Sequence, residues 1–213
     1  MKNILNSLLI SVFILSSCKT DKQTNTPVKS DINESKDIFY SVDAGNTEVL
    51  WTAYKTTAKT AVKGKFIQLK IDNPIQSDTK QGALSNLNFE IPVTSFFSSN
   101  EERDSKIKSL FFGVMKETSF LSGSFSDVNG NENSGSVTLN LKMNNETVPV
   151  PLSYTIDDRK ILLEGDINLM DWKMDEAYNS IHKACEVLHT GPDGISKTWK
   201  EVKINAVAML KTK

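Results

Sequence analysis

Cysteine is scarce in this chain, and neither sign of charge is in excess. The 213 residues include two cysteines, Cys18 and Cys185, so the sequence cannot encode a disulfide-rich scaffold. The 25 basic residues balance 26 acidic ones to a net charge of −1, which argues against a nucleic-acid-binding surface. The chain also lacks a phosphate loop, a nucleophile elbow and a metalloprotease helix, so no common catalytic motif points to an enzyme.

The chain has no apolar run long enough to cross a bilayer, which takes about 20 residues. The longest run, residues 4–15, follows a short basic start and is typical of a secretory signal. It ends in Leu15-Ser16-Ser17-Cys18, which resembles the bacterial lipoprotein box and implies cleavage before Cys18 and acylation of that residue. The alternative is a plain signal peptide with an incidental cysteine. We therefore predict a lipid-anchored envelope protein, at the outer membrane and facing the periplasm.

Three regions follow from this reading. Residues 1–17 form the signal peptide, and residues 18–37 are polar, so they predict a flexible tether with little to bury. Residues 38–213 have the length of one domain. If Cys18 carries lipid, Cys185 has no partner in the chain, and packing alone must hold this domain together.

Alternation of apolar and polar residues predicts an all-β domain. Eight stretches alternate, at residues 49–53, 62–71, 83–93, 121–125, 137–143, 148–154, 161–169 and 202–210. A change of phase between Phe66 and Ile67 predicts a bulge in the second stretch. Three glycines, Gly64, Gly123 and Gly165, fall on the inward phase, where glycine marks a bend or a place that something else occupies. We expect a closed, strongly bent sheet with free space inside it.

Two helices interrupt the strands. Ser99-Asn100-Glu101-Glu102 predicts a capping box at the start of the first. The second is predicted from the helical spacing of Tyr178, Ile181, Cys185 and Leu188 and ends at Gly191. We expect each helix to cover an end of the barrel as a lid.

These elements carry the motifs of a known family. Asn100, Glu102-Arg103-Asp104 and Leu110-Phe111-Phe112 resemble the pattern that follows the third strand in YceI-like proteins. Val62-x-Gly64-x-Phe66, Gly165-x-Ile167 and Asp171-Trp172 resemble its other signatures, and the resemblance spans residues 46–210. It implies an eight-stranded antiparallel, lipocalin-like barrel whose apolar lumen binds a polyisoprenoid without catalysing a reaction. The chain departs from the family pattern at residues 177–199, so the lid there is expected to differ.

The predicted function is therefore lipid binding in the lumen, as a carrier, reservoir or sensor in the cell envelope. The predicted lining is apolar, with the three inward glycines supplying the space between the larger side chains. The larger residues are Trp51, Phe66, Leu87, Phe89, Phe125, Leu139 and Ile167. The alternative is a filled core without a ligand.

The polar residues suggest two further sites and one structural cluster. Lys59 and Lys63 are expected at one rim, where they would contact a pyrophosphate or anionic lipid heads; the alternative is a solvated edge. Cys185 and His189, with His182, share one helical side and suggest an alternative function in envelope redox or metal chemistry. Glu102-Arg103-Asp104 resembles an acid–base cluster, but helix capping and ion pairing explain it better.

Overall fold

The computed structural model describes residues 37–117 and 119–213. The predicted signal peptide, Cys18 and all but the last residue of the predicted tether lie outside the described residues. None of the helices within these ranges combines the length and the apolar character that a membrane crossing requires.

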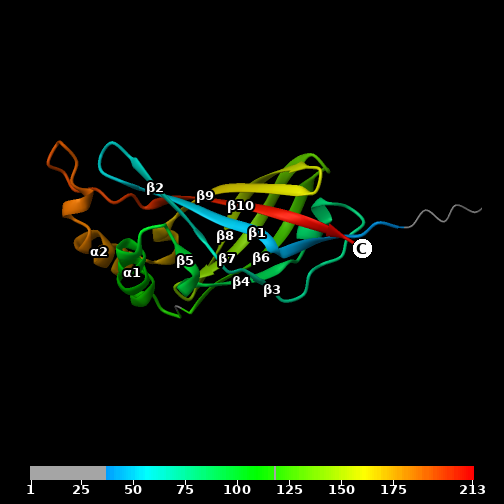
Figure 1. The fold of residues 1–213 in the computed structure, drawn as a ribbon, viewed down its shortest axis with the longest axis horizontal. Coiled ribbons are helices and arrows are strands. Elements are labelled where there is room, and N and C mark those ends of the chain that lie inside the picture. The colour runs from blue at the N-terminus through cyan, green and yellow to red at the C-terminus, as the bar shows by residue number, and fades with distance from the viewer. Residues whose placement is uncertain (1–36, 118) are drawn as a thin grey trace, which may run out of the picture. The chain divides into compact units, whose positions relative to one another are not determined.

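A curled antiparallel sheet of ten strands dominates the described residues, as the alternation predicts (Figure 1). The order across the sheet is β3-β4-β6-β7-β8-β9-β10-β1-β2-β5. The strands are β1 (Tyr40–Lys55), β2 (Thr60–Phe66), β3 (Lys70–Ile71), β4 (Asn88–Pro92), β5 (Phe96–Phe97), β6 (Phe120–Gly130), β7 (Ser134–Met143), β8 (Glu146–Asp157), β9 (Lys160–Asn168) and β10 (Glu201–Thr212). The first and last strands pair, as expected, from Tyr40↔Thr212 to Thr52↔Lys203.

Eight expected strands become ten because two of them are interrupted. The second predicted strand breaks after Phe66, where the phase change predicts a bulge, and resumes as β3. Ile67 at the break is 59% exposed, so it does not face inward. The third is observed as β4, which ends at the 3₁₀ turn η2 (Val93–Ser95), and the chain resumes beyond the predicted strand as β5. Phe66 pairs with Phe96 on one side of the break and Lys70 with Glu90 on the other.

The prediction of a strand over residues 83–93 is wrong in its first half. Residues 81–84 form the 3₁₀ helix η1 (Gln81–Leu84), and both Ala83 and Leu84 are buried. Adjacent buried residues are incompatible with a strand that has one wet face, because successive strand side chains point to opposite faces. The strand begins only at Asn88.

The two helices lie at the same end of the sheet, which corrects the expectation of one lid at each end (Figure 1). They are α1 (Glu101–Leu110) and α2 (Asp175–Ala184). The turns η3 (Phe112–Val114) and η4 (Leu169–Trp172) lead from and into them. The predicted second helix ends early, at Ala184, and a short turn, η5 (Val187–His189), follows it. Leu188 is consequently 58% exposed instead of lying on a helical apolar stripe.

A buried carboxylate fixes the start of α1. Asn100 is the N-cap and accepts a hydrogen bond from the backbone N–H of Arg103 at 2.8 Å. Asp104 is 7% exposed and accepts from the backbone N–H of Ser98 at 3.1 Å and from the Ser98 hydroxyl. Arg103 donates to the Ser98 hydroxyl at 2.7 Å and to its carbonyl at 2.8 Å. The Glu-Arg-Asp motif therefore joins α1 to the end of β5, which is a structural role.

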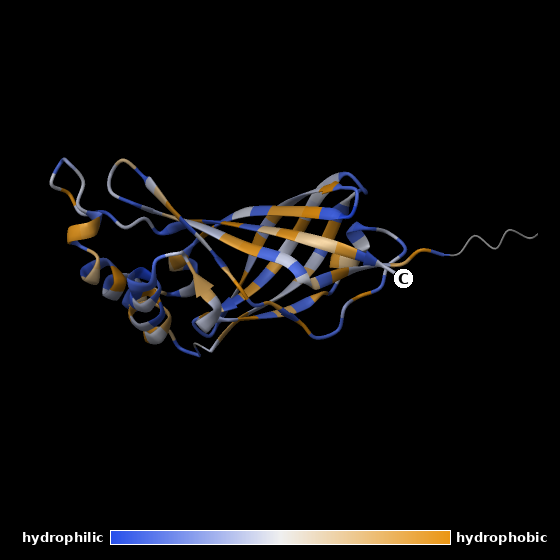
Figure 2. Cartoon of the chain, viewed as in Figure 1, coloured by the Kyte–Doolittle hydropathy of each residue, from blue (hydrophilic) through white to orange (hydrophobic). Residues whose placement is uncertain are grey.

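Apolar and polar residues alternate along the strands of the sheet (Figure 2). The inward residues of β7, β8 and β9 are almost completely buried; for example, Val137, Tyr154 and Ile161 are at most 2% exposed. Trp172 is fully buried beneath the helices and donates its indole N–H to the carbonyl of Leu141 at 2.9 Å. This end of the domain is thus closed by packed side chains.

We expect Asp104→Ala to lower the free energy of unfolding by about 2 kcal/mol, because it leaves the buried N–H and hydroxyl of Ser98 without their acceptor. Ser105→Ala, which lies on the exposed side of the same helix, should change it by less than about 0.5 kcal/mol. Equilibrium unfolding in urea measures both. Equal losses in the two variants would contradict the anchoring role of Asp104.

Candidate functional site

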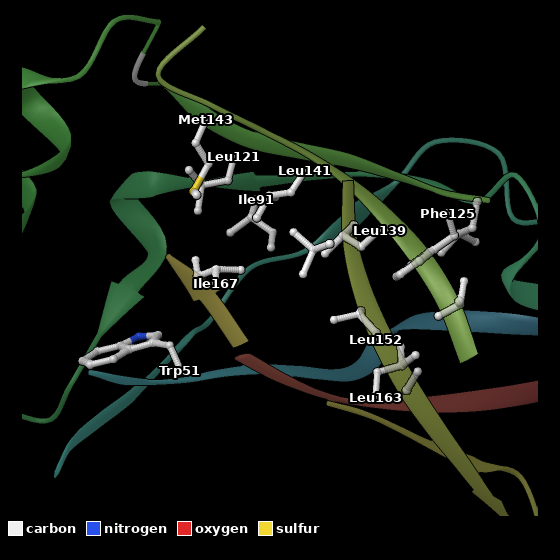
Figure 3. Close-up of a cluster of buried hydrophobic side chains, with 14 of the residues drawn as sticks. Trp51, Ile91, Leu121, Phe125, Leu139, Leu141, Met143, Leu152, Leu163 and Ile167 are labelled. Carbon is white, nitrogen blue, oxygen red and sulfur yellow. The ribbon is translucent and has the colours of Figure 1, made fainter. Parts of the chain in front are cut away.

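An apolar cavity of about 80 Å³ lies inside the curled sheet and is partly open to the surface. Its walls come from both halves of the sequence, and all of the lining residues except Thr47 and Asn205 are apolar. The lining consists of Val42, Thr47, Val49, Leu69, Ile71, Leu84, Leu87, Phe89, Ile91, Phe125, Leu139, Leu152, Leu163, Ile204, Asn205, Ala206 and Ala208. Figure 3 shows Phe125, Leu139, Leu152 and Leu163 converging on this space from neighbouring strands.

A register break in β1 forms one wall of the cavity. Between the pairs Asp43↔Met209 and Glu48↔Val207, β1 has four residues where β10 has only Ala208. The Asp43 carboxylate accepts from the backbone N–H of Gly45 at 3.1 Å and from the Asn46 side chain at 2.8 Å. The Asn46 hydrogen bond is the main cause that lowers the pKa of Asp43. The bulge is therefore held by its own polar groups, and Thr47 beyond it lines the cavity.

The hollow lies on one side of the sheet interior. Inward residues of β1, β3, β4 and β10, such as Val49, Ile71, Phe89 and Ala206, remain partly exposed although they pack against the core. Their counterparts on β7, β8 and β9 are buried. The partial exposure of inward apolar side chains is what distinguishes this cavity from an ordinary packed core.

Four of the seven predicted lining residues line the cavity: Leu87, Phe89, Phe125 and Leu139. Trp51, Phe66 and Ile167 do not, although Trp51 and Ile167 are buried. Trp51 stacks on Phe96 with 4.7 Å between ring centroids, and Phe66 and Phe112 pack edge-on against the same ring. This aromatic cluster fills part of the interior.

Neighbouring side chains fill the space beside each of the three inward glycines, so the prediction that these glycines supply free space is wrong. A Cβ on Gly64 would collide with the Trp51 ring, and a Cβ on Gly165 with Leu152. A Cβ on Gly123 would come within 2.6 Å of Phe89. Each glycine therefore accommodates a large residue of the adjacent strand, as in the aromatic rescue of strand glycines.

Small residues on β10 are the signal that the sequence reading missed. Ala206 and Ala208 were expected to face inward but were not identified as lining residues. Both border the cavity, together with larger residues of the neighbouring strands such as Val49 and Leu163.

One buried polar group in the interior, the indole N–H of Trp51, has no hydrogen-bond partner among the described residues. Buried donors are rarely left unpaired in native proteins, and leaving one unpaired costs about 1–3 kcal/mol. This N–H is available to an oxygen atom that enters the interior.

The geometry above is that of a known family of binding proteins. The family model described as the YceI-like domain matches residues 40–208. The chain belongs to the YceI-like family. Members of this family are generally binding proteins rather than enzymes.

Solved structures share this YceI-like fold. A polyisoprenoid-binding domain from Saccharophagus degradans aligns with a TM-score of 0.57 and 12% identity, covering 82% of this chain and 98% of that one. The Campylobacter jejuni YceI protein aligns with a TM-score of 0.51 and 16% identity, covering 72% and 86% respectively. At these identities the likeness shows a common fold. A comparison with curated protein sequences gives no match.

The predicted rim lysines of this YceI-like domain do not border the cavity. Lys59 lies in the hairpin between β1 and β2, at the end that carries the helices, and its ammonium lies 4.7 Å from the Trp199 ring centroid. Lys63 is exposed on β2, one residue before the inward Gly64, and therefore points outward. Their contact with an anion stays a prediction.

The two histidines of this YceI-like domain share one hydroxyl. The Nδ1 atoms of His182 and His189 lie 2.9 Å and 2.6 Å from Oγ1 of Thr198. Burial, aided by nearby Lys55 and His182, lowers the pKa of His189, and burial raises the pKa of the Cys185 thiol. A raised pKa keeps a thiol protonated and unreactive. No group of three potential metal ligands occurs among the described residues. None of these observations favours the redox or metal alternative.

We expect Gly64→Ala to destabilise the domain by about 1–3 kcal/mol, because the added methyl group meets the Trp51 ring and the carbonyl of Phe97. Gly45→Ala is the matched control, since its nearest neighbour would be an Asp43 oxygen at 3.5 Å, an ordinary contact. Equilibrium unfolding of both variants checks the prediction. Equal stability of the two would show that Trp51 does not depend on this glycine.

Proposed function

We propose that this domain binds an isoprenoid or a similar long-chain amphiphilic lipid inside its sheet, without catalysing a reaction. The observation that carries the proposal is the set of inward apolar side chains that stay partly exposed around the cavity. The shared fold with a polyisoprenoid-binding domain supports the lipid class. Transfer from water contributes about 0.8 kcal/mol for each buried CH₂ group, so hydrocarbon alone provides ample affinity.

The ten strand segments act as eight strands of a lipocalin-like barrel. β2 and β3 follow each other along the chain, as do β4 and β5, and the two bent units pair on both sides of their bends. Between these pairs, the backbone N–H of Ile67 donates to the carbonyl of Ser95 at 3.0 Å. Counting each bent unit as one strand gives eight and joins the two ends of the sheet. An eight-stranded barrel has room for one small ligand.

The wall formed by β3 is the part that can move to admit a long chain. A cavity of about 80 Å³ is smaller than the roughly 300–1,000 Å³ of pockets that enclose drug-sized ligands. β3 has only two residues, and both are paired only with β4. Leu69 and Ile71 of this segment line the cavity and are half-buried. Short, weakly paired segments open at the lowest free-energy cost.

A lipid gains little free energy by moving from a bilayer into another apolar environment. The domain would therefore exchange lipid with a membrane, which is the behaviour of a carrier, reservoir or sensor. A signal peptide at residues 1–17, acylation of Cys18 and a tether to residue 37 would hold it at the cell envelope, with the outer membrane facing the periplasm as the proposed site. Several acyl chains provide stable anchoring where one is marginal.

Filling the cavity tests the proposal. Ala206 faces the cavity, whereas Val207, the next residue of β10, pairs with Glu48 and Leu162 on the outer face. We expect Ala206→Phe to weaken the binding of a polyprenol at least about tenfold, because the ring occupies the cavity. Val207→Phe, the matched control, should bind like the parent. Titration with a fluorescent polyprenol measures the affinities, and circular dichroism confirms that both variants fold.

Organic extraction of protein purified from its native source, followed by mass spectrometry, supplies an independent readout. Co-purifying lipid that is reduced in Ala206→Phe but not in Val207→Phe supports binding in the cavity. Equal uptake of polyprenol by folded Ala206→Phe and Val207→Phe would remove the cavity as the site.

The free indole N–H of Trp51 gives a second test. A lipid that extends from the cavity towards the helices would bring an oxygen of its polar end to this donor. We expect Trp51→Phe to weaken polyprenol binding about two- to tenfold, the range of one hydrogen bond. Binding of an isoprenoid hydrocarbon without oxygen should not change. An equal loss for both ligands would mean that the ring acts through packing and not through its N–H.

A further inference from the structure

Exposed apolar side chains gather at the end of the domain that carries the helices. Val187 is 88% exposed, Leu188 58% and Ile195 55%. The first two belong to η5, and Ile195 belongs to the turn that follows it, where its carbonyl accepts from the backbone N–H of Gly191. This end lies opposite the one where β1 begins and β10 ends (Figure 1).

Hydrogen bonds hold these turns against the hairpin between β1 and β2, so that they form one surface. Lys55 donates to the carbonyl of Leu188 at 3.3 Å, and the backbone N–H of Lys197 donates to the carbonyl of His189 at 3.1 Å. The indole N–H of Trp199 donates to the carbonyl of Thr56 at 2.8 Å. Thr57 donates to the Asp193 carboxylate at 2.5 Å. The aliphatic side chains are therefore presented on a braced scaffold.

Lysines and aromatic rings belong to the same hairpin and turns. The Lys59 ammonium lies 4.9 Å from the Tyr54 ring centroid and 4.7 Å from that of Trp199. The Lys197 ammonium lies 5.1 Å from the centroid of the same Trp199 ring. We call Val187, Leu188, Ile195, Lys59, Lys197 and Trp199 the tip surface.

The charge of the hairpin and of the turns after α2 differs from that of the whole chain. Residues 54–63 and 183–200 contain six lysines and only two carboxylates, Glu186 and Asp193, although the chain as a whole has a net charge of −1. One of those carboxylates is already bonded to Thr57. The helices at the same end add five carboxylates against three further basic residues. The surplus of positive charge therefore belongs to the hairpin and the turns that carry the aliphatic residues, and there it complements an anionic surface.

We propose that the tip surface docks onto an anionic lipid bilayer. Exposed aliphatic side chains enter the boundary between head groups and acyl chains, where Trp is also enriched. The ammonium groups of Lys59 and Lys197 lie over aromatic rings. Both side chains are exposed, so their ammonium groups are accessible to the lipid phosphates. This contact goes beyond lipid binding in the cavity and does not depend on it, because the tip surface and the cavity share no residue.

The fluorescence of Trp199 reports this contact locally. The chain has three tryptophans, of which Trp51 and Trp172 are at most 7% exposed. The full chain with Cys18→Ser is bound to vesicles of phosphatidylcholine and phosphatidylglycerol with brominated acyl chains. We expect bromine to quench the fluorescence and Trp199→Phe to abolish the quenching. These vesicles contain no isoprenoid, so failure of lipid binding in the cavity would leave this result unchanged.

Two sets of variants complete the experiment. Val187→Ser, Leu188→Ser and Ile195→Ser together should reduce quenching at least threefold, whereas Ile67→Ser, an exposed apolar control elsewhere, should not. Lys59→Gln with Lys197→Gln should weaken the contact with anionic vesicles about fivefold per lysine. Lys160→Gln with Lys211→Gln, at the opposite end, is the control. Vesicle-bound protein whose Trp199 is not quenched, or quenching that the triple variant leaves intact, would overturn the proposal, as would a protein partner that covers the tip surface while lipid does not.

Discussion

The pairing of the first strand with the last is the constraint on which the rest of the structure depends. β1 and β10 bond from Tyr40↔Thr212 to Thr52↔Lys203, and β1 uses its other edge to pair with β2. A buried backbone N–H or carbonyl must find a partner, so a sheet joined in this way curls and separates an inner from an outer face. The bulge after Asp43 is tolerated because that carboxylate bonds the local N–H groups. The cavity lies beside this bulge, where the inner wall recedes without breaking the pairing.

The interior has a filled part and a hollow part, and in both parts small residues lie beside larger ones. Where the large side chain reaches across, as Trp51 does over Gly64, the space is filled and an aromatic cluster forms. At Ala206 and Ala208 the cavity remains between their methyl groups and larger lining residues such as Val49 and Leu163. The location of the hollow is therefore set by the reach of neighbouring side chains and not by the small residues themselves.

The strands could be predicted from the sequence, but the side chains that fill the space beside each small residue could not. Period-two alternation identified the strands from β6 to β10 and the break after Phe66, since one buried face leaves that pattern. It extended the strand before Asn88 because Ala83, Ser85 and Leu87 alternate, whereas the burial of Leu84, which reveals a 3₁₀ turn, is a tertiary property. The inward placement of the glycines was inferable, but which side chain covers each one depends on cross-strand register. The contact of His182 and His189 with Thr198 likewise required the fold, because the second predicted helix ends before His189.

The narrowness of the cavity follows from the stability of small domains. An unfilled apolar volume costs about 24 cal/mol per Å³, so a cavity of about 80 Å³ costs about 2 kcal/mol. A permanent lumen of about 300 Å³ would cost about 7 kcal/mol by the same measure, which rivals the roughly 5–15 kcal/mol that holds a whole domain together. A domain that stays mostly packed avoids this cost, and an arriving hydrocarbon then supplies the contacts that its own side chains give up. The weak pairing of β3, together with the burial of the β7–β9 face, confines that rearrangement to one side of the domain.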